Sequence, residues 1–238
     1  MLALAGNNYL VESFGNSIGA DIAEFTGEAI EFTLDSCIGE DGILKDIPFV
    51  GTALKLCNIT SKVQEKHSFY KLKTFIREIN ARTASPEELE ERKQKFLSKA
   101  EFRQQELEYI LILIDRYVSF DKAKMLAKLY LAYMDGKIIW EEFTMYAEVI
   151  DRFLLLDCRT LTSGAEKFIV PHGIIGGESI LRLVALGLMA EVTDTSAFKE
   201  HDNGNISMTW ETLTRSVSTD KVYRRTEFGE KLANILRE

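Results

Sequence analysis

Apolar positions in this chain recur mostly every three or four residues, the spacing that places them on one face of an α-helix. Over residues 8–35 the spacing predicts one long amphipathic helix with a second row of small residues along it. The apolar face is Val11, Phe14, Ile18, Ile22, Phe25, Ala29 and Phe32, and the small row is Gly15, Gly19, Ala23 and Gly27. Small residues let another helix approach closely. We therefore interpret the small row as a candidate packing surface, facing the next helix, a second copy of the chain or lipid.

Residues 42–57 form the most apolar stretch of the N-terminal third, and Asp46 followed by Pro48 predicts the start of a helix there. Its uncharged run, Ile47 to Leu54, is eight residues long and too short to cross a bilayer. We interpret the stretch as a buried helix packed on the first one. The alternative is a membrane-inserting hairpin over residues 8–57, in which Ile47, Phe49, Val50 and Leu54 would enter the bilayer.

The middle of the chain predicts further helices. One covers residues 61–81, with its apolar face at Phe69, Leu72, Phe75, Ile76 and Ile79. Ser85, Pro86 and Glu88 form a capping-box start signal. The helix they open is expected to continue to about Tyr117, where Ser119 and Asp121 mark a break. Two more helices are predicted over residues 121–134 and 140–157.

The turn between these two helices looks like the second half of an EF-hand. With Gly136 at position 6 of the calcium loop and Glu142 at position 12, Leu131 and Tyr133 fall at the first two ligand positions. Neither carries a carboxylate, so only Asp135 and Glu142 remain as ligands. We expect a structural helical hairpin here and no calcium site.

The same hairpin, residues 121–157, resembles the TerB-like helical domains of bacterial tellurite-resistance and stress proteins. Their repeating unit is an apolar helix, a D-G-x-[IV] turn, an acidic pair and a second apolar helix. The matching residues are Asp135, Gly136, Ile138, Glu141 and Glu142. The resemblance implies the hairpin and an association with stress or defence. The metal binding linked to that family is not carried over, because this chain matches the turn once.

The last third changes to an α+β pattern. A helix is predicted over residues 178–189, strands over Ile206–Trp210 and Val222–Arg225, a turn at Asn203-Gly204, and a capped helix from Thr226. Residues 172–238 resemble the end of a bacterial winged-helix domain, whose pattern is L-x-x-L-G-L-[IM], a hairpin, then Y-x-x-T-x-x-G-x-x-[LF]. The matching residues are Leu183, Leu186, Gly187, Leu188, Met189, Tyr223, Thr226, Gly229 and Leu232.

A DNA-reading winged helix needs polar and basic side chains on the helix that enters the major groove. Helix 178–189 offers Ser179 and Arg182 and begins with Glu178. The candidate nucleic-acid contacts are Arg182, Arg215, Lys221, Arg224 and Arg225. Acidic residues surround them, so we expect this part to serve protein contact or packing. A DNA-binding transcription regulator is the alternative.

Charge is distributed unevenly along the 238 residues, whose formal net charge is −8. Residues 1–44 contain eight acids and no base, which leaves 29 acids against 29 bases in the remainder. This acidic arm disfavours general attraction to nucleic acid or anionic lipid. It suits a basic partner surface, or it is a solvated face.

Candidate catalytic and metal-binding residues do not cluster in the sequence. Cys37, Cys57 and Cys158 are odd in number and show no CxxC spacing, and His67, His172 and His201 stand far apart. The loop Gly173–Gly177 lacks the G-K-[ST] ending of a P-loop. We expect no enzyme activity, cofactor, metal or small-molecule substrate.

These patterns predict a mainly α-helical protein. An N-terminal bundle covers about residues 1–165, including an acidic helical arm at about 1–44, and a small α+β winged-helix-like domain covers 170–238. We expect a non-catalytic cytoplasmic interaction protein of bacterial or phage origin, acting in stress response or antiviral defence through protein partners or self-association. Cytoplasmic placement follows from the start Met-Leu-Ala-Leu-Ala, which lacks the basic segment of a signal peptide.

Overall fold

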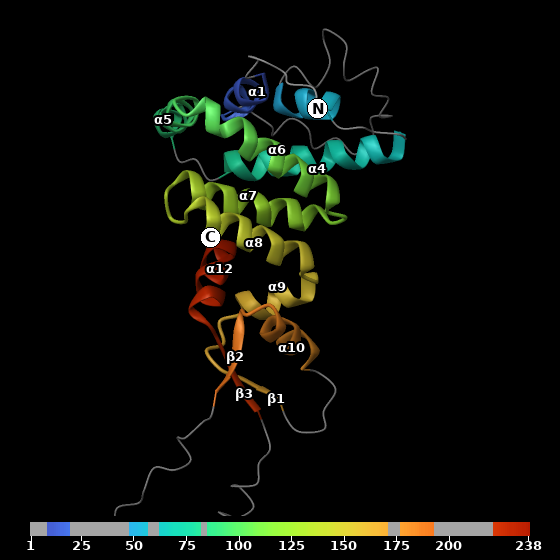
Figure 1. Cartoon of the computed structure of the whole chain (residues 1–238), viewed down its shortest axis with the longest axis vertical. Coiled ribbons are helices and arrows are strands. Elements are labelled where there is room, and N and C mark those ends of the chain that lie inside the picture. The colour runs from blue at the N-terminus through green and yellow to red at the C-terminus, as the bar shows by residue number, and fades with distance from the viewer. Residues whose placement is uncertain (1–8, 20–47, 57–61, 82–84, 171–176, 193–220) are drawn as a thin grey trace, which may run out of the picture. The chain divides into compact units, whose positions relative to one another are not determined.

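The computed structural model describes residues 9–19, 48–56, 62–81, 85–170, 177–192 and 221–238 (Figure 1). It is mainly helical, with one three-stranded antiparallel sheet. The chain divides into two compact units, Met1–Asp151 and Arg152–Glu238, which we call the N-terminal and C-terminal units. The division lies ahead of the expected boundary at residues 165–170, because the helix at 155–162 packs against elements of the C-terminal unit.

Helices build the described part of the N-terminal unit. They are α1 (Tyr9–Ser17), α3 (Pro48–Leu56), α4 (Lys62–Ala81), α5 (Pro86–Leu97), α6 (Ala100–Arg116), α7 (Phe120–Met134) and α8 (Trp140–Arg152). The helix start predicted at Ser85 is confirmed, and the break predicted at Ser119 coincides with the start of α7. The Ser85 hydroxyl accepts a hydrogen bond from Glu88 N at 3.2 Å, and the Ser119 hydroxyl accepts one from Asp121 N at 3.1 Å.

The first helix is shorter than the sequence pattern predicts. It ends at Ser17, and Gly19 follows with φ +85°, a left-handed conformation that interrupts a helix. Asn80 of α4 holds this end through its side-chain amide, which donates to Ser17 O at 2.9 Å and accepts from Gly19 N at 3.1 Å. The prediction of one uninterrupted helix over residues 8–35 is therefore wrong, and Ala23 and Gly27 lie outside the described residues.

Two other predicted helices are also divided. The segment from Pro86 to Tyr117 breaks at Ser98 and Lys99, where a charged helix, α5, gives way to the more apolar α6. The helix predicted over residues 140–157 ends at Arg152, and a new helix begins at Leu155. At the predicted turn, Gly136 has φ +74° and Lys137 N donates to Ala132 O at 2.8 Å, so glycine meets a backbone requirement there.

Phe14 of α1 lies at the centre of the N-terminal unit's core and is fully buried. Its ring contacts four others from four different helices, with centroid distances of 4.8–6.4 Å: Phe49, Phe75, Phe96 and Tyr130. The predicted inward face of α4 is also buried throughout. The 3.6-residue periodicity thus identified the core side of these helices correctly.

Several buried polar groups in this unit are paired within it. Glu106 accepts hydrogen bonds from Arg103 Nη1 and from the Tyr133 hydroxyl, both at 2.6 Å. Burial, followed by this contact with Glu106, raises the pKa of Tyr133 to about 12. The Lys71 ammonium donates to Asp115 O at 3.0 Å and Tyr117 O at 2.8 Å, so a buried cation caps the C-terminus of α6.

The described part of the C-terminal unit consists of three helices and the sheet. Its elements after α8 are α9 (Leu155–Thr162), β1 (Phe168–Val170), α10 (Glu178–Ala185), β2 (Met189–Val192), β3 (Lys221–Arg225) and α12 (Glu227–Arg237). The strand order is β1-β3-β2, with Phe168 opposite Tyr223 and Met189 opposite Arg225. The strand predicted at Val222–Arg225 is confirmed. The one predicted at Ile206–Trp210 and the Asn203-Gly204 turn lie outside the described residues, as do Arg215 and Ile47.

The two sequence segments that carry the winged-helix resemblance touch each other. Thr226 donates its backbone N–H to Leu188 O at 3.0 Å and its hydroxyl proton to Gly187 O at 2.8 Å. The same hydroxyl accepts from Gly229 N at 3.0 Å and caps α12. Gly187 has φ +74°, and Gly229 lies directly against the Leu188 carbonyl. Both glycines therefore meet a geometric requirement where α12 joins the sheet.

Candidate functional site

Arg182, the predicted base-contacting residue of α10, is bound to a buried carboxylate. Asp157 of α9 is 0% exposed, and its Oδ1 lies 2.7 Å from Arg182 Nη2. Arg182 Nε lies 3.1 and 3.0 Å from the two carboxylate oxygens, and Ser179 Oγ donates to Oδ1 at 2.8 Å. Leu154 N donates to Oδ2 at 3.1 Å. Both polar side chains that α10 could offer to DNA are thus used to hold α9.

The electrostatics of this cluster favour the charged carboxylate. Burial opposes ionisation of Asp157, but hydrogen bonds from Arg182, Ser179 and Leu154 N outweigh it and lower the pKa of this carboxyl. The guanidinium forms the bidentate arrangement typical of strong arginine–carboxylate pairs. Moving Arg182 onto a phosphate would leave a buried charge without its partner, at a cost in stability.

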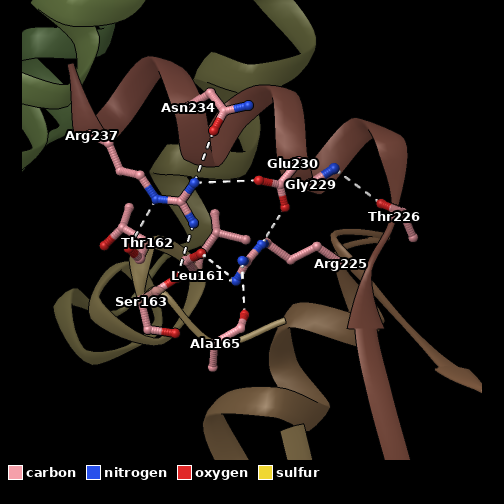
Figure 2. A network of polar contacts seen from close by, with 10 residues as sticks. All are labelled: Leu161, Thr162, Ser163, Ala165, Arg225, Thr226, Gly229, Glu230, Asn234 and Arg237. Carbon is pink, nitrogen blue, oxygen red and sulfur yellow. Dashed lines mark hydrogen bonds and ion pairs between the residues drawn. The ribbon is translucent and has the colours of Figure 1, made fainter. Parts of the chain in front are cut away.

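Arg225 is likewise engaged inside the unit, where it caps α9 together with Arg237 (Figure 2). Arg225 donates to the carbonyls of Leu161, Ser163 and Ala165 at 2.8–3.3 Å, and Arg237 donates to those of Thr162 and Ser163 at 2.9–3.0 Å. Glu230 of α12 lies between the two guanidiniums and pairs with both. These contacts, with Arg225 contributing most, lower the pKa of Glu230. Two cations at a helix C-terminus also compensate its partial negative charge.

Mutation of the adjacent residues Arg224 and Arg225 should change the stability of the protein by different amounts. Arg225→Ala removes charge-assisted hydrogen bonds to three carbonyls and the ion pair with Glu230, so we expect the free energy of unfolding to fall by about 2 kcal/mol. Arg224 is exposed, and Arg224→Ala should change the free energy of unfolding by less than about 0.5 kcal/mol. Urea unfolding followed by circular dichroism measures both. Equal effects of the two substitutions would contradict the structural role of Arg225.

The remaining candidate cations differ in their surroundings. Lys221 Nζ lies 2.9 Å from Glu191 Oε2 across the β2–β3 pair. Arg224 points to solvent from the central strand. Of the five predicted nucleic-acid contacts, the four that lie in the described residues are therefore mostly engaged in ion pairs within the unit. Three of them, Arg182, Lys221 and Arg225, have carboxylate partners of their own.

The outward face of α10 is acidic and apolar. Ser179, Ile180 and Leu183 are buried, which turns Glu178, Leu181 and Ala185 to the solvent. Leu181 is 54% exposed. We call these three exposed residues the α10 face. A leucine at the centre of a helix face suits contact with another protein, whereas a glutamate at its start repels phosphate.

Those residues predicted for self-association or membrane insertion that the structure describes lie within or beside the N-terminal core. Gly15 is buried, and an added Cβ would come within 2.8 Å of Leu97 Cδ2 of α5. The apolar residues of α3 are buried as well: Phe49 and Val50 are fully covered, and Leu54 nearly so. Among the described segments, no helix is both long enough and apolar enough to span a bilayer.

The two carboxylates that align with calcium-ligand positions, Asp135 and Glu142, have partners within the protein. Asp135 accepts from Arg92 Nη2 at 3.3 Å, and Glu142 accepts from Ile139 N at 3.1 Å at the start of α8. The described residues contain no group of three or more histidine, cysteine, aspartate or glutamate side chains placed to hold a metal ion.

Comparison of the chain with protein-family models, with curated proteins and with solved structures finds no match.

Sequence reasoning did not identify Asp157 as the partner of Arg182. The spacing of Ser179 and Arg182 indicates one shared helix face, but the partner lies more than twenty residues earlier on another helix. One local signal was present. An acid three residues after the start of a helix often accepts from that start, as Asp157 does from Leu154 N.

Proposed function

We propose that the protein is a non-catalytic interaction protein whose C-terminal unit has a winged-helix-like fold used for protein contact. The antiparallel pairing of β2 with β3, followed directly by the capped α12, supports the winged-helix interpretation. A role in bacterial or phage stress response or defence rests on the resemblance of residues 121–157 to TerB-like domains.

The α10 face carries this proposal. In a DNA-reading winged helix, the outward positions of the corresponding helix supply donors and cations to the base edges. Here those positions hold Glu178, Leu181 and Ala185, and Arg182 is bound to Asp157. Leu181 would instead provide the apolar centre of a protein interface. The cores of protein interfaces are depleted in charged residues and are more apolar than their rims.

DNA binding by the full chain tests the proposal directly. We expect mixed-sequence duplex DNA to bind no more tightly than typical non-specific association, with a Kd weaker than about 10⁻⁶ M at physiological salt. Arg224→Ala should leave that weak association almost unchanged, because a single phosphate contact contributes little. Gel-shift titration over a range of salt concentrations provides the measurement.

Leu181→Asp supplies the matching test of the α10 face. If the face binds a second copy of the chain, light scattering will show an oligomer that this substitution dissociates. Ala185→Ser, on the same face, serves as a control that adds no charge. A tight, salt-dependent DNA complex that weakens in both Arg182→Ala and Arg224→Ala would contradict the proposal and support a transcription regulator.

A further inference from the structure

One side of α4 in the N-terminal unit is basic and faces the solvent. The core side of this helix carries its apolar residues, and the opposite side carries residues at spacings of four, three and four: Lys66, Tyr70, Lys73 and Arg77. Lys66 and Arg77 are exposed, and Tyr70 is 38% exposed. From Lys66 to Arg77 the helix rises about 16 Å.

Helix α7 runs beside α4 in the same direction. Near its start, Phe120 contacts the rings of His67 and Tyr70 at centroid distances of 4.9 and 6.4 Å. Further along, Tyr130 contacts Phe75 at 6.4 Å. Because both contacts advance together along the two helices, residues that follow Phe120 lie beside residues that follow Tyr70.

This arrangement adds lysines from α7 to the basic side of α4. Lys124 and Lys128 follow Phe120 at one and two helical turns, which places them on the same side of α7 as Phe120. Both are partly exposed. We call the combined surface the α4–α7 basic face, and it consists of Lys66, Lys73, Arg77, Lys124 and Lys128.

Positive charge is crowded on this surface. Burial, and then the neighbouring charge of Arg77, lower the pKa of Lys73, so the two cations lie close enough to repel each other. Carboxylates occur at its edges, where Asp121 lies 3.5 Å from Lys124 and Glu78 is partly buried on α4. An anionic partner would relieve the repulsion between Lys73 and Arg77.

The end of the face nearest Phe120 is apolar. Val118 is 83% exposed and Phe120 is 40% exposed, although large apolar side chains are usually covered. The Val118 carbonyl lies 3.0 Å from His67 Nε2, which fixes the corner between α6 and α7 against α4. An apolar anchoring site thus lies beside a basic stripe.

We propose that the α4–α7 basic face binds an acidic segment of a protein partner, with one large apolar side chain of that segment placed on Val118 and Phe120. An acidic helix of about eleven residues matches the length from Lys66 to Arg77. The occupant is inferred from charge complementarity, because a protein of net charge −8 attracts anions only where cations gather locally. The α4–α7 basic face contains no residue of the C-terminal unit.

The observations favour a peptide over a nucleic acid. Bases bind to flat aromatic platforms, whereas Tyr70 and Phe120 meet edge to face, with an interplanar angle of 76°. The most exposed apolar group at this end is the aliphatic side chain of Val118. An aliphatic anchor suits a leucine or isoleucine of a partner helix better than a base.

Fluorescence anisotropy with the full chain tests the proposal. The probes are a labelled peptide of glutamate and alanine with one leucine near its end, the same peptide with alanine in place of that leucine, and labelled oligothymidine of similar length. We expect the leucine peptide to bind most tightly and to dissociate as salt is added. The variant Lys66→Glu/Arg77→Glu should weaken its binding about tenfold or more, the effect of losing about 1.4 kcal/mol.

A matched control separates local from overall charge. Lys95→Glu/Lys99→Glu makes the same change in net charge at two exposed lysines around the α5–α6 break. It should leave the Kd of the leucine peptide within about twofold. Thermal unfolding of both variants verifies that each remains folded.

Three results would overturn the proposal. The first is no binding of the leucine peptide at low salt. The second is tighter binding of oligothymidine than of this peptide, which would assign the face to nucleic acid. The third is equal weakening by the two double variants, because the effect would then come from the charge of the whole protein.

Discussion

Replacement of Gly229 by alanine is expected to destabilise the C-terminal unit more than alanine at any other glycine that the structure describes. The added Cβ would lie 2.0 Å from the Leu188 carbonyl oxygen and 2.8 Å from its carbon. Both atoms belong to the backbone, so no side-chain rotation relieves the overlap. α12 would have to move away from the strand that begins at Met189. We expect a loss of about 3 kcal/mol or more in the free energy of unfolding.

Urea denaturation followed by far-ultraviolet circular dichroism measures this loss, and Gly164→Ala is the matched control. Gly164 lies in the same unit, and its added Cβ would have no atom within 4 Å. The free energy of unfolding of the Gly164→Ala control should stay within about 0.5 kcal/mol of that of the original protein. Comparable stability of the two variants would contradict the close approach of α12 to Leu188. The hydrogen bonds from Thr226 would then need another explanation.

Loss of the Asp157 carboxylate is expected to have the second large effect. In Asp157→Ala, the Ser179 hydroxyl, the Leu154 amide and the Arg182 guanidinium all lose the buried carboxylate that accepts their hydrogen bonds. We expect the free energy of unfolding to fall by about 3 kcal/mol at neutral pH, because hydrogen bonds to a charged group contribute more than average ones and several are lost together. Asp157→Asn keeps the shape and part of the bonding, so its loss should be smaller.

The Asp157–Arg182 ion pair also predicts the direction in which the free energy of unfolding changes with pH. The pKa of Asp157 is lower in the folded protein than the value of about 3.9 in an unfolded chain. The unfolded state therefore takes up the proton first as the pH falls, and the stabilisation from this group is present above about pH 4 and lost below it. Asp157→Asn should remove this contribution. The difference in stability between the original protein and this variant should then narrow between pH 6 and about pH 3.

If that difference stayed constant over the same pH range, Asp157 would have the same pKa in both states and the Arg182 pair would contribute no net stabilisation. Glu230, whose pKa is also lowered, titrates in the same range in both proteins. Its effect therefore cancels in the comparison.

The sequence determined which side of most helices is buried. Phe14, Phe75 and Ile79 were placed in the core by their spacing alone, because burial of apolar surface drives folding and follows the period of the helix. Ser85 marked a helix start and Ser119 a break between helices for an equally local reason, since a cap bonds to backbone within its own first turn. Thr226 likewise indicated the start of a capped helix.

Only the tertiary structure decided where helices stop and which cations are engaged. Continuation of the first helix past Ser17 was consistent with the apolar pattern, but Asn80, more than sixty residues away, binds the chain at Ser17 and Gly19. Arg182 and Arg225 look like phosphate contacts in the sequence and are bound to Asp157 and to the end of α9 in the fold. Helix periodicity depends on neighbours three and four residues apart, whereas the partner of a charge depends on which distant segments the fold brings together.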